Sequence, residues 1–137
     1  MPTTATLTFT GSKLEPAWAP DLARTQAFKI GSGAHVAGEV LGFVSASGAV
    51  DTYATGNGDG TETAAVIAQY AMYSDGTHVS LTTGSALLDG ETATDAPCYI
   101  QGYFRCSDLT GLDSGAIADM QARLIGANTV SGVLALF

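Results

Sequence analysis

The loop Gly-Asn-Gly-Asp-Gly at residues 56–60 has residue types that could bind a calcium ion or a phosphate. A calcium loop of the EF-hand type needs acidic residues at its first, third and fifth positions, glycine at the sixth and glutamate at the twelfth. With Asp59 fifth and Gly60 sixth, the first position is Thr55 and the twelfth is Val66. The register therefore fails at both ends, and the pattern does not predict an EF-hand.

Two other ligands can be considered for the same loop. A looser calcium site made by Asp51, Asp59 and Glu62 stays open, although a plain acidic turn is the more frequent use of such a sequence. A phosphate-binding loop is disfavoured because no G-K-[ST] follows the glycines and Asp59 would repel a phosphate. We expect no metal and no cofactor here.

Candidate catalytic side chains are few. His35 and His78 are the only histidines, and neither lies in a nucleophile or metal-binding motif, so each is expected to be a satisfied or exposed histidine. Three acids cluster in one polar loop, where solvation is the expected state: Asp89, Glu91 and Asp95. Aromatic side chains could stack sugars, but the strand patterns around them favour a core or an interface: Tyr70, Tyr99 and Tyr103. The sequence predicts no catalytic residues and no enzyme.

The two cysteines, Cys98 and Cys106, flank a segment that is typical of a strand. Eight residue steps in a strand span about 26 Å, which is far beyond the reach of a disulfide. We expect two reduced, mostly packed thiols.

Length and charge restrict the classes of partner. The 137 residues suit one domain with a real core, and no apolar run approaches the roughly 20 residues of a membrane span. The start of the chain has neither the basic residues nor the apolar block of a signal peptide, so we expect synthesis in the cytoplasm without export. The net charge of −8 lies entirely in residues 27–137, which makes direct nucleic-acid binding improbable.

The secondary structure expected from the sequence begins with an N-terminal arm at residues 1–26. The segment "ATLTFT" alternates as a strand does, and prolines at positions 16 and 20 exclude a helix after it. We expect an extended arm whose first 20 residues are mobile in the free protein, with Trp18 exposed until a partner binds. Deletion of residues 2–20 should then leave the stability of the body nearly unchanged.

The body, residues 27–137, is predicted to be mainly β (α+β), a compact domain of short strands. Two strands joined at Ser47-Gly48 precede the glycine loop, and the apolar run "AAVIAQYAM" after it is typical of a fully buried strand. Asp75-Gly76 predicts a hairpin turn, and "CYIQGYFRC" a strand with a possible bulge at its glycine.

One short C-terminal helix is predicted near residues 113–125. Asp113 or Ser114 can cap it, and Ile117, Met120 and Leu124 form an apolar stripe. Asp119 and Arg123 have the spacing of a helical ion pair. Gly126 suits the residue after the helix end, and "TVSGVLALF" suggests a closing strand.

The order of these segments resembles the lambda-type head decoration proteins of tailed bacteriophages. The shared features are a G-x-V-L-G strand at residues 38–42, a D-G-[ST]-x-x-A-x-x-[IL] segment at 59–67, a strand with a central glycine, and a short helix near the end. The resemblance covers about residues 27–137. A longer loop at 84–96 and a glycine one residue early after the helix depart from the family pattern.

The resemblance implies a β-tulip-like fold and a structural function. Such a protein binds the outer surface of the expanded capsid as a homotrimer, at three-fold and quasi-three-fold sites, and stabilises the shell against DNA pressure. Its partner would be the major capsid protein, with no direct nucleic-acid or membrane contact. The arm suits strand addition to that partner, through the residues Thr6, Leu7, Thr8, Phe9 and Trp18. The glycine loop would then be a turn that leads into a buried strand.

One alternative of a different class stays open from the residues alone. A small β-domain on a virion or cell surface could bind glycans or calcium with the same composition.

Overall fold

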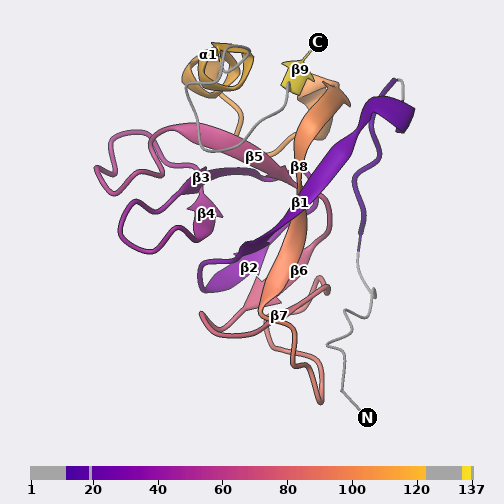
Figure 1. Cartoon of the computed structure of the whole chain (residues 1–137), viewed down its shortest axis with the longest axis vertical. Coiled ribbons are helices and arrows are strands. Elements are labelled where there is room, and N and C mark those ends of the chain that lie inside the picture. The colour runs from indigo at the N-terminus through magenta and orange to yellow at the C-terminus, as the bar shows by residue number, and fades with distance from the viewer. Residues whose placement is uncertain (1–11, 19, 123–133, 137) are drawn as a thin grey trace.

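The computed structural model describes residues 12–18, 20–122 and 134–136. Their strands are short except for one long strand late in the chain, and one α-helix follows it (Figure 1). The strands are β1 (Arg24–Lys29), β2 (Gly33–His35), β3 (Val40–Phe43), β4 (Val50–Thr52), β5 (Ala64–Ala68), β6 (Met72–Ser74), β7 (Val79–Ser80), β8 (Asp95–Phe104) and β9 (Leu134–Leu136). The helices are η1 (Pro20–Leu22), η2 (Cys106–Asp108) and α1 (Ser114–Ala122), of which η1 and η2 are 3₁₀ turns. The predicted mainly β fold with one short C-terminal helix is confirmed.

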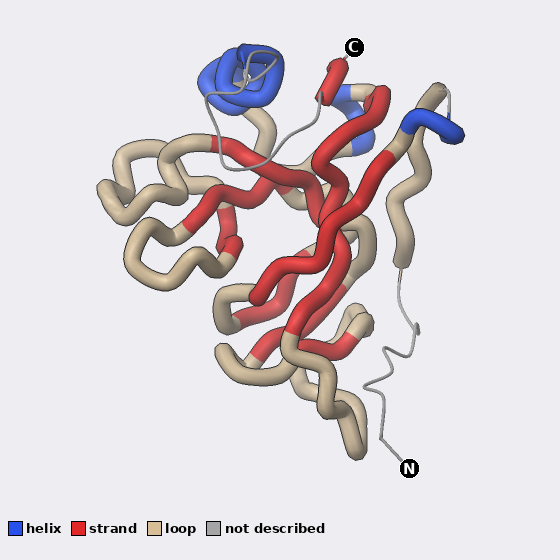
Figure 2. Tube along the Cα trace, in the orientation of Figure 1, coloured by secondary structure: helices blue, strands red, loops and turns tan. Residues whose placement is uncertain are grey.

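The strands form two sheets (Figure 2). The larger has the order β1-β8-β5-β3-β4, all antiparallel, and β9 pairs in parallel with the end of β8. The smaller has the order β2-β6-β7. The large sheet curves until its two ends meet, because Ile30, just after β1, bridges Val50 of β4 and the Gly31 amide donates to the Val50 carbonyl at 2.7 Å.

Each face of the large sheet carries its own hydrophobic cluster. Side chains such as Leu41 and Val66 point between the two sheets, while Val40 and Ile67 point to the opposite face, where α1 lies. Since both faces of the central strands are covered, all five residues of β5 are buried. This confirms a buried strand in the apolar run predicted at residues 64–72, but the strand ends at Ala68, and Met72 begins β6 of the smaller sheet.

The turns follow the predicted residues closely. Ser47 and Gly48 lie in the connection between β3 and β4, and Gly48 has a φ of 74°. In the hairpin of β6 and β7, the Asp75 side chain accepts hydrogen bonds from the amides of Thr77 and His78 at 2.8 and 2.7 Å. Gly76 has a φ of 95°, which other residues rarely adopt.

The helix begins as predicted. The Asp113 carboxylate accepts a hydrogen bond from the Ala116 amide at 2.8 Å, which is a side-chain cap. Of the predicted apolar stripe, Met120 is fully buried and Ile117 is half-buried, whereas Leu124 lies outside the described residues. Arg123 and Gly126 also lie outside them. Asp119 instead accepts a hydrogen bond from the Ala64 amide of β5 at 3.0 Å, which ties the helix to the sheet.

The boundary expected at residue 26 does not separate two units in the structure. Residues 24–26 belong to β1, which pairs with β8 over its whole length. Leu14 is buried in the cluster beneath α1. The expectation that all of the first 20 residues are mobile is therefore wrong for residues 12–18, because an apolar side chain and backbone hydrogen bonds hold them to the body. Residues 1–11 lie outside the description.

Candidate docking surface around Trp18

The segment at residues 12–18 lies against the body as an extended chain, on the same side as β1 and β8 (Figure 1). Its backbone makes isolated antiparallel bridges at Lys13 and Trp18 rather than one continuous strand pairing. Three backbone hydrogen bonds fix it: Ala71 N to Ser12 O at 2.8 Å, Leu14 N to Gln69 O at 2.7 Å, and Ala17 N to Tyr103 O at 2.8 Å. The segment therefore reaches from the β5–β6 connection to the end of β8.

Leu14 is the residue that anchors this segment. Its side chain is 9% exposed, and the Tyr99 hydroxyl donates to its carbonyl oxygen at 2.8 Å. The Tyr99 ring in turn packs on Phe104, with ring centroids 4.9 Å apart. Sequence reasoning missed Leu14, because a single apolar residue between charged neighbours gives no periodic signal.

Trp18 stays largely outside although its segment is docked. It is 62% exposed, and its ring contacts the Tyr103 ring edge-on, with centroids 5.0 Å apart and an interplanar angle of 78°. Leu22 is 50% exposed, and the Gln101 side-chain amide of β8 donates to its carbonyl at 2.7 Å. We call Trp18, Leu22 and Tyr103 the Trp18 surface.

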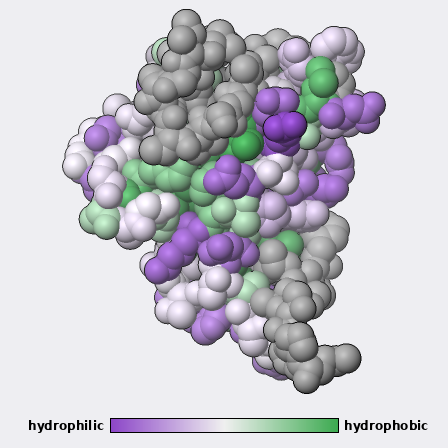
Figure 3. All heavy atoms as spheres, in the orientation of Figure 1, coloured by the Kyte–Doolittle hydropathy of each residue, from purple (hydrophilic) through white to green (hydrophobic). Residues whose placement is uncertain are grey.

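The setting of the Trp18 surface is partly basic. Arg24 lies opposite Gln101 in the strand register, and Arg105 follows directly after β8; both are exposed. Neither has an ion-pair partner among the described residues. Figure 3 shows hydrophobic and hydrophilic patches side by side over this end of the molecule, near η1. An apolar centre with charged residues at its edge, among them the exposed Asp21 of η1, suits a protein partner that offers a hydrophobic pocket and complementary charges.

The other predicted docking residues cannot be placed. Thr6, Leu7, Thr8 and Phe9 lie outside the described residues. Of the predicted set, only Trp18 has a position, and that position is exposed as expected.

The glycine loop is built as a turn. The Asp59 carboxylate accepts hydrogen bonds from the Thr61 hydroxyl at 2.5 Å and the Thr61 amide at 3.0 Å, and these bonds hold the pKa of Asp59 below its usual range. Thr61 is buried at the entrance to β5 and also accepts a bond from the Asn57 side chain at 3.1 Å. The third candidate calcium ligand, Asp51, faces His35 instead. In the part of the chain that the structure describes, no three potential metal ligands come together.

The acidic loop before β8 also serves local structure. Glu91 accepts a hydrogen bond from the Ala93 amide at 3.2 Å, and Asp95 lies opposite Lys29 in the pairing of β1 with β8. No paired carboxylates of a catalytic kind are formed among these described residues.

Tyr70 is half-buried against the core, and its ring centre lies 5.8 Å from the Lys13 ammonium.

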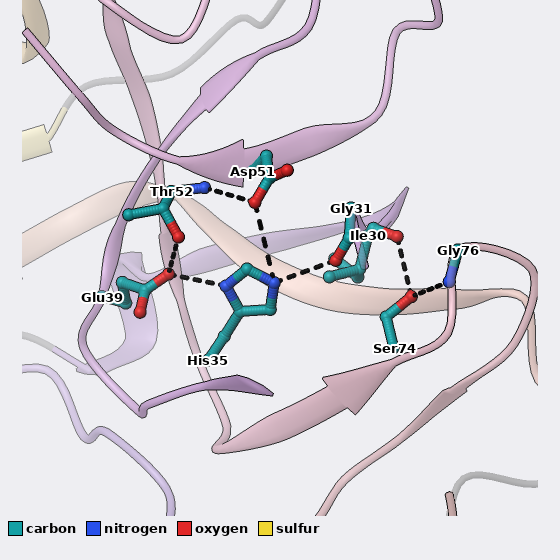
Figure 4. Close-up of polar contacts among 8 residues, drawn as sticks. All are labelled: Ile30, Gly31, His35, Glu39, Asp51, Thr52, Ser74 and Gly76. Atoms are coloured by element: carbon teal, nitrogen blue, oxygen red, sulfur yellow. Dashed lines mark hydrogen bonds and ion pairs between the residues drawn. The ribbon is translucent and has the colours of Figure 1, made fainter. Parts of the chain in front are cut away.

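The most polar buried cluster surrounds His35 (Figure 4). The imidazole lies between Glu39, the Gly31 carbonyl and Asp51, and the Thr52 hydroxyl donates to Glu39 at 3.0 Å. The His35 side chain is 1% exposed, so a substrate could not reach it. His35 is therefore a satisfied, buried histidine, one of the two states expected for it.

Neither family models nor curated protein sequences give a match to this chain. The relation to head decoration proteins therefore stays a prediction from segment order. Among the helices of the described residues, none has the length and hydropathy needed to cross a membrane.

Proposed function

We propose that this protein is a phage capsid decoration protein. It would bind the outer surface of the expanded head at three-fold and quasi-three-fold sites as a homotrimer and stabilise the shell against DNA pressure. The observation that carries the proposal is a docked N-terminal segment that leaves a tryptophan 62% exposed at its end. The segment order that resembles the decoration family supplies the identity of the partner, the major capsid protein.

The geometry around Trp18 supports a docking function on energetic grounds. Tryptophan is among the residues that dominate binding energy at protein interfaces, because a large rigid ring is desolvated at small entropic cost. Residues 12–18 are already ordered on the body by backbone hydrogen bonds and by Leu14. A partner that binds Trp18 therefore does not have to order the segment, which costs about 1–2 kcal/mol per residue.

A trimer would multiply a modest contact. If each copy binds one capsid subunit, the second and third contacts form at a high effective concentration, and the avidity exceeds the single affinity by orders of magnitude. Three contacts of modest affinity can therefore hold the trimer firmly on the capsid.

The test is co-sedimentation with emptied, expanded heads of the phage that encodes the protein. We expect Trp18→Ala to weaken binding at least tenfold, since loss of an interface tryptophan commonly costs about 2 kcal/mol. Val36→Ala is the matched control, because Val36 is 48% exposed and belongs to the connection after β2. Full-affinity binding of Trp18→Ala would show that the Trp18 surface is not the anchor, and no binding of the wild type would contradict the decoration function itself.

One observation favours a second function, a small β binding module for glycans. The exposed Trp18 ring and the neighbouring Tyr103 ring form an aromatic pair of the kind that stacks against sugars. A glycan array separates the two functions, because a decoration protein should bind heads and no sugar. Saturable glycan binding that Trp18→Ala abolishes would favour the module.

A further inference from the structure

The His35 cluster joins segments of both sheets at one point (Figure 4). His35 ends β2 in the small sheet, whereas Thr52 and Asp51 belong to β4 in the large sheet. Glu39 comes from the connection between β2 and β3. A change in this cluster therefore acts on the contact between the sheets and not on one element alone.

The hydrogen-bond partners fix the protons on the ring. Nε2 lies 3.0 Å from the Gly31 carbonyl oxygen, which can only accept, so Nε2 must carry a proton. Nδ1 lies 2.6 Å from Glu39 Oε2, and the same oxygen already accepts from the Thr52 hydroxyl. An ionised carboxylate oxygen can only accept, so Nδ1 donates to the Glu39 carboxylate and both ring nitrogens are donors.

A ring that donates from both nitrogens is an imidazolium. Its charge is offset by Glu39 and, at 3.9 Å from Nε2, by Asp51. The close approach of Asp51 depends on a glycine, because a Cβ at Gly31 would collide with the Asp51 carboxylate. The remaining neighbour across the strand pairing, Met72 of β6, is uncharged. Among the described residues, the polar groups that face the ring are thus two carboxylates and one carbonyl.

We propose that His35 is a protonated latch between the two sheets, and that loss of its proton as pH rises loosens the body. The neutral ring has only one N–H, so it would turn a nitrogen lone pair toward either the Glu39 carboxylate or the Gly31 carbonyl oxygen. Either tautomer loses a buried hydrogen bond and the positive charge that offsets the two carboxylates, which is destabilising. The proposal is independent of capsid binding.

The direction of the pKa shift agrees with this geometry. Burial lowers the pKa of His35, but the hydrogen bonds with Glu39 and the Gly31 carbonyl and the charges of Glu39 and Asp51 outweigh it, so the net pKa is raised. A raised pKa in the folded state means that the stabilisation is complete below the unfolded value of about 6.5 and is lost as pH rises through the folded pKa. Within that window the unfolding constant should rise up to tenfold per pH unit, as the linkage of one proton requires.

The test combines a titration with matched variants of the full chain. NMR of the imidazole nitrogens should show His35 doubly protonated at pH 6, with a midpoint above 6.5, and His78 provides the internal comparison. Melting temperatures should fall between pH 6.5 and the His35 midpoint in the wild type and in His78→Gln. The fall should disappear in Glu39→Gln, which keeps the shape of the glutamate and removes its charge.

Each outcome decides the proposal. A midpoint at or below 6.5, or a His35 ring that is neutral at pH 6, overturns it. An unchanged fall in melting temperature with rising pH in Glu39→Gln overturns it too, because the dependence then belongs to another group. If Glu39→Gln does not fold, the wild-type nitrogen titration alone decides between a latch and a neutral histidine.

Discussion

Replacement of Leu14 by alanine should destabilise the whole body, although Leu14 lies in the segment that the sequence assigns to an arm. The side chain is 9% exposed and packs in the same cluster as Tyr99 and Met120. Buried Leu→Ala changes cost about 2–5 kcal/mol, and a site at the edge of the core belongs near the lower end, at about 2–3 kcal/mol. For a chain of this size we expect a fall in melting temperature of about 6–12 °C.

The assay is thermal and urea unfolding followed by circular dichroism, with Leu22→Ala as the control. Leu22 is 50% exposed, so the same change there should shift the free energy of unfolding by less than about 0.5 kcal/mol. Hydrogen exchange gives a second readout at the amides of Leu14 and Ala71, which donate across the contact. Equal stability of Leu14→Ala and the wild type would refute the docked segment.

Two truncations extend this reasoning. Deletion of residues 2–11 should leave the melting temperature nearly unchanged, whereas deletion of 2–20 should lower it at least as much as Leu14→Ala, because it removes the Leu14 contact and its hydrogen bonds. This reverses the expectation from sequence that residues 2–20 could be removed without effect. Equal melting temperatures for the two truncations would restore that expectation.

Three further predictions concern the body. Gly60→Ala should destabilise the protein by more than Gly56→Ala in urea unfolding, because both residues have positive φ but only at Gly60 would a Cβ collide with the last carbonyl of β3; equal effects would contradict the packed loop. The amide of the third helical residue and a tyrosine hydroxyl hold the pKa of Asp113 below its usual value, so the helix cap should weaken as pH falls below about 4. Asp113→Ala should lose this part of the acid dependence of the melting temperature. A thiol reagent should label the half-buried Cys106 of the native protein and reach Cys98 only after unfolding, because burial raises the pKa of Cys98 and blocks access. Rapid labelling of both thiols in the native protein would contradict the core position of Cys98.

Local sequence patterns predicted much of the fold. The apolar run of β5, the Asp75-Gly76 turn and the Asp113 cap each depend on residues close together in the chain, and all three are confirmed. The long-range contacts were not predictable in this way. β1 pairs with β8 about 70 residues later, so the arm boundary at residue 26 fell inside a strand.

The polar cluster at His35 escaped prediction for a related reason. His35 and Glu39 are four residues apart, a spacing that brings side chains together on a helix, but here the chain turns between two strands. Asp51 joins them only because the large sheet closes through Ile30 and Val50. The residue types were visible in the sequence, but their proximity depends on sheet closure.

Reconstruction of expanded heads saturated with the protein tests the proposed decoration function. We expect trimers on the outer surface at three-fold and quasi-three-fold positions, with Trp18 buried against the major capsid protein. Heads that stay bare at saturating protein, or isolated monomers at these positions, would contradict it.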